Sequence, residues 1–203
     1  MSGRADQVGV GPWRGPQLAD PRLDPDLLAH GDRRNVADRY RYWTVEAIKD
    51  DLRARAHPFH VAVENLQHDF NIGAVVRNAN AFLAAGVHIV GRRRWNRRGA
   101  MMTEVYLDVR HHPTVAELAA WAAAEALPVL GVDNLPGAVP IDRADLPGAC
   151  VLLFGQEGPG LSAEARGLVD RVMSIRQFGS TRSINAGVAS GIAMHEWIRR
   201  HAP

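Results

Sequence analysis

The chain has a single cysteine and a single lysine, and it lacks any long apolar run. Cys150 is alone among 203 residues, which excludes an internal disulfide and fits a reducing compartment. No segment approaches the roughly 20 apolar residues of a membrane helix. The polar first 15 residues lack the apolar centre of a secretion signal. We therefore expect a cytoplasmic protein without a membrane segment.

Patterns that identify several common enzyme classes are also missing. There is no His-Glu-x-x-His pair, and the adjacent His111 and His112 must point apart, so no metal site is expected. No P-loop or Gly-x-Ser-x-Gly elbow occurs. The first predicted strand continues into Asn65-Leu66 without the glycine that opens a dinucleotide-binding turn. Cys150 begins an apolar run, so we interpret it as a packed residue and not as a nucleophile.

Arginine supplies nearly all of the positive charge. The net charge is only +2, but the isoelectric point is about 9.1, and Lys49 is the one lysine. The planar guanidinium of arginine suits phosphate oxygens. A nucleic-acid partner is thus permitted by the composition, although composition alone does not require one. Apolar residues make up 46% of the chain, which is enough for a real core.

From residue 57 onward, short apolar runs alternate with helical segments, as is typical of an α/β fold with a parallel sheet. Residues 1–35 are rich in glycine and proline and predict an extended arm, and residues 35–55 predict one or two helices. We therefore divide the chain into an N-terminal extension, 1–56, and an α/β domain, 57–203. Strands are predicted over 59–63, 87–90, 128–132, 150–154 and 172–175, and helices over 72–85, 114–126, 162–169 and 185–200.

Three segments carry residues suited to chemistry. In the first, Asn71 stands at a predicted helix start, with Gly73 and Arg77 following, and we expect Arg77 to be partly desolvated unless it meets an anion. The second is the turn after strand 150–154, and the third leads into the last helix. Taken singly, each has a plain structural explanation, namely a helix cap, a tight turn or a second cap. The turn contains Gly155, Glu157, Gly158 and Gly160, and the last segment reads Ser183-Ile184-Asn185.

The order and spacing of these segments resemble the three motifs of the SpoU (TrmH-type) RNA 2′-O-ribose methyltransferases of the SPOUT superfamily. The resemblance covers roughly residues 57–203. Ile184 replaces the usual leucine, and Ala186-Gly187 replaces a more typical Val-Ser pair. The resemblance implies a parallel sheet with flanking helices and a deep trefoil knot at the C-terminal end. It also implies a homodimer, with the last helix near Trp197 as our prediction for part of the interface.

The same resemblance implies transfer of a methyl group from S-adenosylmethionine to a ribose 2′-hydroxyl of structured RNA. Arg77 would bind the neighbouring phosphate and stabilise the developing alkoxide, since guanidinium rarely gives up its proton. Asn71, Ser183 and Asn185 would orient the hydroxyl and Arg77, and Glu157 would fix Asn71 or Arg77. The residues that would contact the cofactor are Gly155, Gly158, Ile175, Ile184 and Val132.

A basic loop follows the second predicted strand. Its arginines surround Trp95, which combines phosphate attraction with a stacking face for an unpaired base. A solvated loop is the plainer explanation, but clustered like charges repel unless a polyanion meets them. We therefore predict RNA binding, to which the N-terminal arginines would add. The loop arginines are Arg92, Arg93, Arg94, Arg97 and Arg98.

Other functions stay open at this stage. Transfer RNA is the preferred substrate because compact members of this family often act on it, and ribosomal RNA is the alternative. A catalytically silent RNA-binding or ribosome-assembly protein could keep the same fold. A further alternative is a nucleotide-binding α/β protein that holds phosphate in the glycine turn at residues 155–160.

Overall fold

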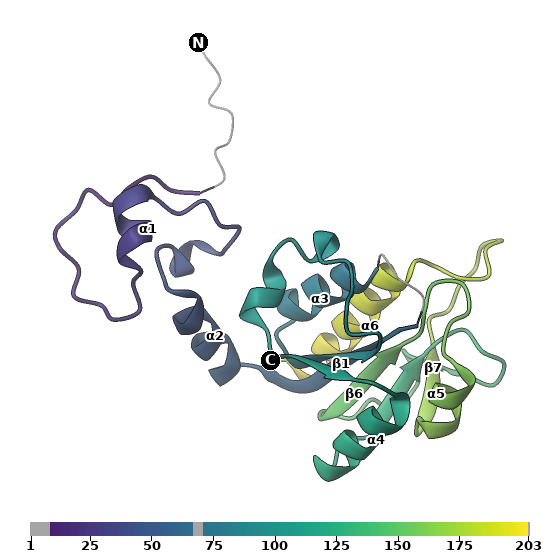
Figure 1. Cartoon of the computed structure of the whole chain (residues 1–203). Helices are drawn as coiled ribbons and strands as arrows, with labels where there is room; N and C mark the ends of the chain where they lie inside the picture. Colours follow the sequence, from purple (N-terminus) through teal and green to yellow (C-terminus); the bar gives the residue numbers. More distant parts are fainter. Residues whose placement is uncertain (1–8, 67–70, 203) are drawn as a thin grey trace. The chain divides into compact units, whose positions relative to one another are not determined.

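The computed structural model describes residues 9–66 and 71–202 (Figure 1). Its contacts divide the chain into two compact units, Met1–Ala54 and Arg55–Pro203. The described part of the first unit holds helix α1 (Pro25–His30), the short 3-10 turn η1 (Asp38–Tyr40) and helix α2 (Val45–Ala54). None of the helices in the described ranges combines the length and apolar character needed to cross a membrane.

The prediction of an extended N-terminal arm is wrong for residues 9–35. Isolated backbone bridges join Val10 to Asp32 and Leu23 to Trp43. The fully buried Asp32 accepts hydrogen bonds from the Arg34 side chain and from the Tyr42 amide. Burial alone would raise the pKa of Asp32, but these bonds lower it to about 2. The buried Asp32 carboxylate thus holds together turns in a segment whose glycine and proline content predicted an extended chain.

The second unit is built on a seven-stranded sheet in which all the pairings between named strands of the described chain are parallel. Parallel strands end at the same edge of a sheet, so the loops that follow them gather there. The order across the sheet is β3-β2-β1-β6-β4-β7-β5. The strands are β1 (His57–Asn65), β2 (Ala84–Gly91), β3 (Val109–His112), β4 (Val129–Val132), β5 (Val139–Pro140), β6 (Cys150–Phe154) and β7 (Arg171–Ser174).

Helices cover both faces of this sheet (Figure 1). Alternate residues of each strand point to opposite faces, which gives two apolar cores. One core joins Phe59 and Leu152 to helices α3 (Ile72–Ala81) and α6 (Ala186–His201). The other joins the opposite strand faces to α4 (Val115–Ala124) and α5 (Ala163–Leu168). Two short turns, η2 (Arg98–Ala100) and η3 (Thr103–Tyr106), pack against α3.

The central strand β6 is the apolar run predicted at residues 150–154, and Cys150 at its start is fully buried. Burial raises the pKa of the Cys150 thiol to about 12, which suits a packed residue. The helix predicted over 72–85 ends earlier, at Ala81, because Leu83 has a left-handed φ of 55° and strand β2 begins at Ala84. Trp197 is also in the core, where its ring packs at a tilt against that of Phe59, with the ring centres 4.5 Å apart.

Three histidines from neighbouring strands form a hydrogen-bonded row on the α4 face of the sheet. His88 Nε2 lies 3.1 Å from His60 Nδ1, and His88 Nδ1 lies 2.8 Å from His112 Nε2. Trp121 of α4 packs against all three rings. The pKa of His88 is lowered to about 2, mainly because burial disfavours the charged ring. Repulsion from positive charge on His60, His112 or Arg110 acts in the same direction. The row is therefore neutral at physiological pH.

This row predicts a loss of stability in mild acid. The unfolded chain binds a proton at His88 near pH 6.5, whereas the folded chain does not until about pH 2. The free energy of unfolding should therefore fall below pH 6.5, by about 2 kcal/mol at pH 5. Urea titrations at pH 7.5 and 5 measure it. His88→Gln should flatten the dependence and the exposed His195→Gln should not; equal pH dependence in all three proteins would contradict the assignment.

Candidate active site

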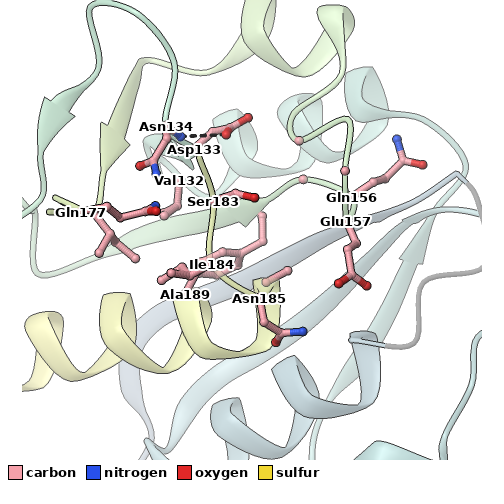
Figure 2. Close-up of a pocket in the computed structure, with 16 residues that line it drawn as sticks. Val132, Asp133, Asn134, Gln156, Glu157, Gln177, Ser183, Ile184, Asn185 and Ala189 are labelled. Atoms are coloured by element: carbon pink, nitrogen blue, oxygen red, sulfur yellow. Dashed lines mark hydrogen bonds between the residues drawn. The ribbon is translucent and has the colours of Figure 1, made fainter. Parts of the chain in front are cut away.

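A cavity of about 280 Å³ lies at the carboxyl edge of the sheet, where the loops after β4, β6 and β7 meet (Figure 2). Its walls include the apolar side chains of Val132, Ile175 and Ile184. Gly155 and Gly158 also line it, so all five residues predicted to contact a cofactor border one cavity. Their role in binding the cofactor stays a prediction.

The glycine turn after β6 is held in shape by its own backbone and by two carboxylates. Gln156 and Gly160 exchange a pair of backbone hydrogen bonds, each 3.0 Å long. Gly160 has a φ of 70°, which favours glycine. Asp133 accepts a hydrogen bond from the Leu161 amide, and the buried Glu64 accepts one from the Ser162 amide. The turn is thus fixed beside the ends of β1 and β4.

Three residues from the three predicted segments are joined by side-chain hydrogen bonds. Asn185 Nδ2 donates to Asn71 Oδ1 over 2.8 Å, and Asn71 Nδ2 donates to Glu157 Oε2 over 2.7 Å. Asn185 also caps helix α6 by accepting a bond from the Val188 amide. Asn71 precedes α3 but makes no capping bond with its side chain, so the plain explanation of a helix cap does not apply to it. Ser183 lines the same cavity beside Asn185.

Arg77 is placed differently from the other predicted catalytic residues. It is exposed on α3 and is not among the residues that line the cavity. The prediction that packing would partly desolvate it is therefore wrong: its neighbours Val75, Val76 and Ala79 turn into the core, while Arg77 faces outward. Six residues along a helix is about 240° of rotation, so Arg77 projects from another side of α3 than Asn71.

Two residues near the cavity have roles that the sequence did not reveal. Asn78, seven residues after Asn71 and so on the same side of α3, donates to the Gly187 carbonyl and to Ser190 Oγ. Asn78 thus links α3 to the start of α6. The two helices are close there, since a Cβ at Gly187 would lie only 2.8 Å from the Cβ of Ala74. Asp133 pins the glycine turn. Both depend on contacts between distant segments, for which the local pattern gives no signal.

The basic loop after β2 is held in place by hydrogen bonds from the end of the neighbouring strand β1. The buried Asn65 donates from its amide to the carbonyls of Arg92 and Arg94. All five loop arginines are exposed. Trp95, predicted as a stacking face for a base, is half-buried and packs against the core instead, with Arg97 5.7 Å from its ring centre. The charge of the loop therefore faces solvent while much of its aromatic surface does not.

No three histidine, cysteine, aspartate or glutamate side chains in the described ranges are grouped so as to hold a metal ion. What the fold offers is a parallel sheet with a ligand-sized cavity at its carboxyl edge, bordered by glycine backbone and by a network of amides. Such a cavity at the carboxyl ends of parallel strands is the place where α/β proteins of this class bind small molecules.

The chain belongs to the SpoU rRNA Methylase family, whose model matches residues 58–195. It is 34% identical over 197 residues to an uncharacterized tRNA/rRNA methyltransferase of Mycolicibacterium vanbaalenii, an alignment that covers 90% of this chain and 61% of the relative. The chain spans about 60% of the length of the curated relatives it matches.

Solved structures of similar fold include the SpoU methyltransferase AviRb from Streptomyces viridochromogenes, in complex with its cofactor AdoMet. It has a TM-score of 0.64 and 26% identity, covering 71% of this chain and 58% of AviRb. A structure concerned with 2-OH methylation of C/U34 on tRNA has a TM-score of 0.60 and 26% identity. That match covers 71% of this chain and 96% of the other.

Proposed function

We propose that this protein transfers a methyl group from S-adenosylmethionine to a ribose 2′-hydroxyl in structured RNA, in the cytoplasm. The observation that carries the proposal is the hydrogen-bonded chain from Asn185 through Asn71 to Glu157. It links Asn71, from the first family segment, to Glu157 and Asn185, which come from the other two segments and line the cavity. Membership of the SpoU family and the AdoMet complex of AviRb support the choice of cofactor.

The lining of the cavity fits a nucleoside cofactor. Val132, Ile175 and Ile184 offer apolar walls. Gln156 and Gln177 border the cavity. Buried atoms of both side chains have no hydrogen-bond partner within the described structure. Such atoms are costly to leave unpaired, and a bound nucleoside could pair with them. When bound, S-adenosylmethionine would supply an electrophilic methyl group.

The protein's own side chains would bind and orient the RNA hydroxyl. Glu157 accepts from the Asn71 amide, which fixes the direction in which that amide points. Asn71, Asn185 and Ser183 would hold the ribose, and such positioning can remove a large part of a reaction barrier. Arg77 keeps its proton and would bind the adjacent phosphate while stabilising negative charge on the 2′ oxygen. Its exposed position suits a group that contacts the polyanionic substrate. The hydroxyl proton would pass to solvent water as the oxygen–methyl bond forms, and the electrons of the broken methyl–sulfur bond would leave with S-adenosylhomocysteine.

We infer that transfer RNA is the substrate, with ribosomal RNA as the alternative. The structure concerned with methylation of tRNA is matched over 96% of its length, so a comparable core without an added domain has been studied for that reaction. A catalytically silent RNA-binding or ribosome-assembly protein is a different class of function. The linked Asn71, Glu157 and Asn185 favour the enzyme, because a silent protein has no need of them.

We further propose a homodimer whose interface includes the exposed apolar face of α6. Val188 is 55% exposed and Ile192 is 40% exposed, four residues apart on one side of that helix. The predicted interface near Trp197 does not include this side chain, because Trp197 is buried in the core. A second copy of the chain would cover the apolar face, and a two-fold interface would use it on both subunits. Sedimentation analysis measures the assembly.

The deep trefoil knot is also part of the proposal. After β7 the chain has to return from near the sheet edge to α6, which contacts α3 and the central strand β6. The connecting segment, which includes Ser183 and Ile184, lines the cavity together with the loops after β4 and β6. We propose that this segment threads between those loops, which would form the knot, although knots are rare.

Calorimetry separates the enzyme from its alternatives. The proposed enzyme should bind S-adenosylmethionine and S-adenosylhomocysteine, and ATP should not displace them. A silent RNA-binding protein need bind neither. Displacement by ATP together with failure to bind S-adenosylhomocysteine would instead support a nucleotide-binding protein that uses the glycine turn for phosphate.

The basic loop predicts salt-dependent RNA binding. Replacing Arg92, Arg93 and Arg94 by glutamine should weaken binding to a tRNA transcript and lower the slope of log affinity against log salt by about 2 to 3. Filter binding between 50 and 300 mM salt measures this. As a matched control, neutralising the exposed Arg143, Arg166 and Arg171 should change the slope little. The same slope in both triple variants would remove the loop from the RNA surface.

A further inference from the structure

The side-chain amide of Gln177 is an unexplained polar group in the cavity. Gln177 lies shortly after β7, and it lines the cavity. Both its Nε2 and its Oε1 are shielded from water and lack a hydrogen-bond partner. Within the described chain, it is the one residue for which two such atoms are found. Leaving a buried donor and a buried acceptor unpaired costs free energy, so this amide needs an explanation.

Gln177 is separated from the amide network that would orient the ribose. Figure 2 draws it on the side of the cavity where Val132 and Asn134 lie, while Glu157 and Asn185 are on the other side. A ligand whose reactive group sits by Asn71 and Asn185 would therefore place its far end near Gln177. The apolar Val132 and Ile175 line the cavity with it, which suits a flat ring between apolar walls.

We propose that Gln177 recognises the adenine base of the methyl donor, an inference that rests on the proposed function. An amide offers one donor and one acceptor side by side, and adenine presents the complementary pair, its 6-amino group and a ring nitrogen. Oε1 accepts from the 6-amino group, and Nε2 donates to the ring nitrogen. The terminal torsion of glutamine is broad, so the amide can turn toward the ring without moving the backbone.

The chemistry of the pairing makes Gln177 a specificity residue. The apolar walls bind any purine by burial, since they do not distinguish its substituents. Only a paired donor and acceptor rejects a base that lacks the matching group, because the protein atom is then left buried and unpaired. Gln177 therefore selects adenine from other purines and does not take part in methyl transfer.

A cycle of two ligands and three proteins tests this by calorimetry, without measuring activity. The ligands are S-adenosylhomocysteine and its analogue in which hydrogen replaces the 6-amino group. The wild-type protein should bind the analogue about 10-fold more weakly, as expected for one lost hydrogen bond in a buried site. Gln177→Leu should bind the two ligands about equally. Gln177→Glu keeps the acceptor, so it should retain the preference for the 6-amino group while binding both ligands more weakly.

The outcomes distinguish the two proposals. If the wild-type protein fails to bind S-adenosylhomocysteine, the proposed function is overturned. If it binds, but Gln177→Leu keeps the full preference for the 6-amino group, Gln177 does not read the base and the function stands. Should Gln177→Leu fail to fold, Gln177→Glu decides the matter, because loss of the preference in that variant contradicts an acceptor role for the side chain.

Discussion

Replacing Arg77 with alanine should slow methyl transfer to RNA by about 100- to 1,000-fold, the usual effect of removing a group that stabilises a developing oxyanion. Arg77 is exposed and outside the cavity lining, so the affinity for S-adenosylmethionine should stay within about two-fold of wild type, or below 0.5 kcal/mol. Single-turnover transfer from labelled S-adenosylmethionine measures the rate, and calorimetry measures the affinity.

Two variants control this experiment. Arg77→Lys keeps the charge but loses the planar pair of donors, so it should fall between alanine and wild type. Arg166→Ala removes another exposed arginine, from α5 on the opposite face of the sheet, and should transfer methyl groups at the wild-type rate. Transfer by Arg77→Ala within a few-fold of wild type would withdraw the catalytic assignment. A parallel loss of cofactor affinity would move Arg77 into the cofactor site.

Replacing Gly155 with alanine should weaken cofactor binding by about 10- to 100-fold. A Cβ at this position would lie 2.1 Å from the carbonyl carbon of Gly160 and 2.2 Å from the Leu161 nitrogen. Both are backbone atoms, so the turn itself has to open. Overpacking typically costs about 1–3 kcal/mol, and 1.4 kcal/mol is a factor of ten in affinity. Calorimetry with S-adenosylhomocysteine measures the change.

Gly167 in α5 provides the matched control. It is exposed, and a Cβ there would have no heavy atom within 4 Å. Gly167→Ala should leave cofactor affinity unchanged and raise the free energy of unfolding by up to about 1 kcal/mol, since alanine favours a helix. Circular dichroism establishes that both variants fold. If folded Gly155→Ala binds the cofactor as wild type does, the glycine turn does not shape the cofactor site.

Elements with a strong local pattern could be predicted from the sequence. The apolar run of β6 and the capped start of α6 at Asn185 are both found where the sequence indicates. Strand β3 was missed because it lies at the edge of the sheet and its residues Val109–His112 read as a polar loop. Strand β5 was missed because it is only two residues long and includes a proline.

In the candidate site, too, residues within a local motif could be predicted and residues outside one could not. The motifs singled out Asn71, Glu157 and Asn185, which the structure links by hydrogen bonds. Asn78 and Gln177 were not found, because an asparagine within a helix and a glutamine in a loop carry no local sign of function. Their importance comes from segments distant in the sequence: α6 for Asn78, and the cavity walls for Gln177.

The measurement that bears most directly on the central claim is a map of ribose 2′-O-methylation in total RNA from cells with and without this protein. We expect at least one site, most readily in a transfer RNA, to lose its methyl group in the absence of the protein. Purified protein with S-adenosylmethionine should restore it, and the Arg77→Ala variant should not. Identical methylation maps, together with no transfer to unmodified RNA in vitro, would contradict the assignment of this chain as a 2′-O-methyltransferase.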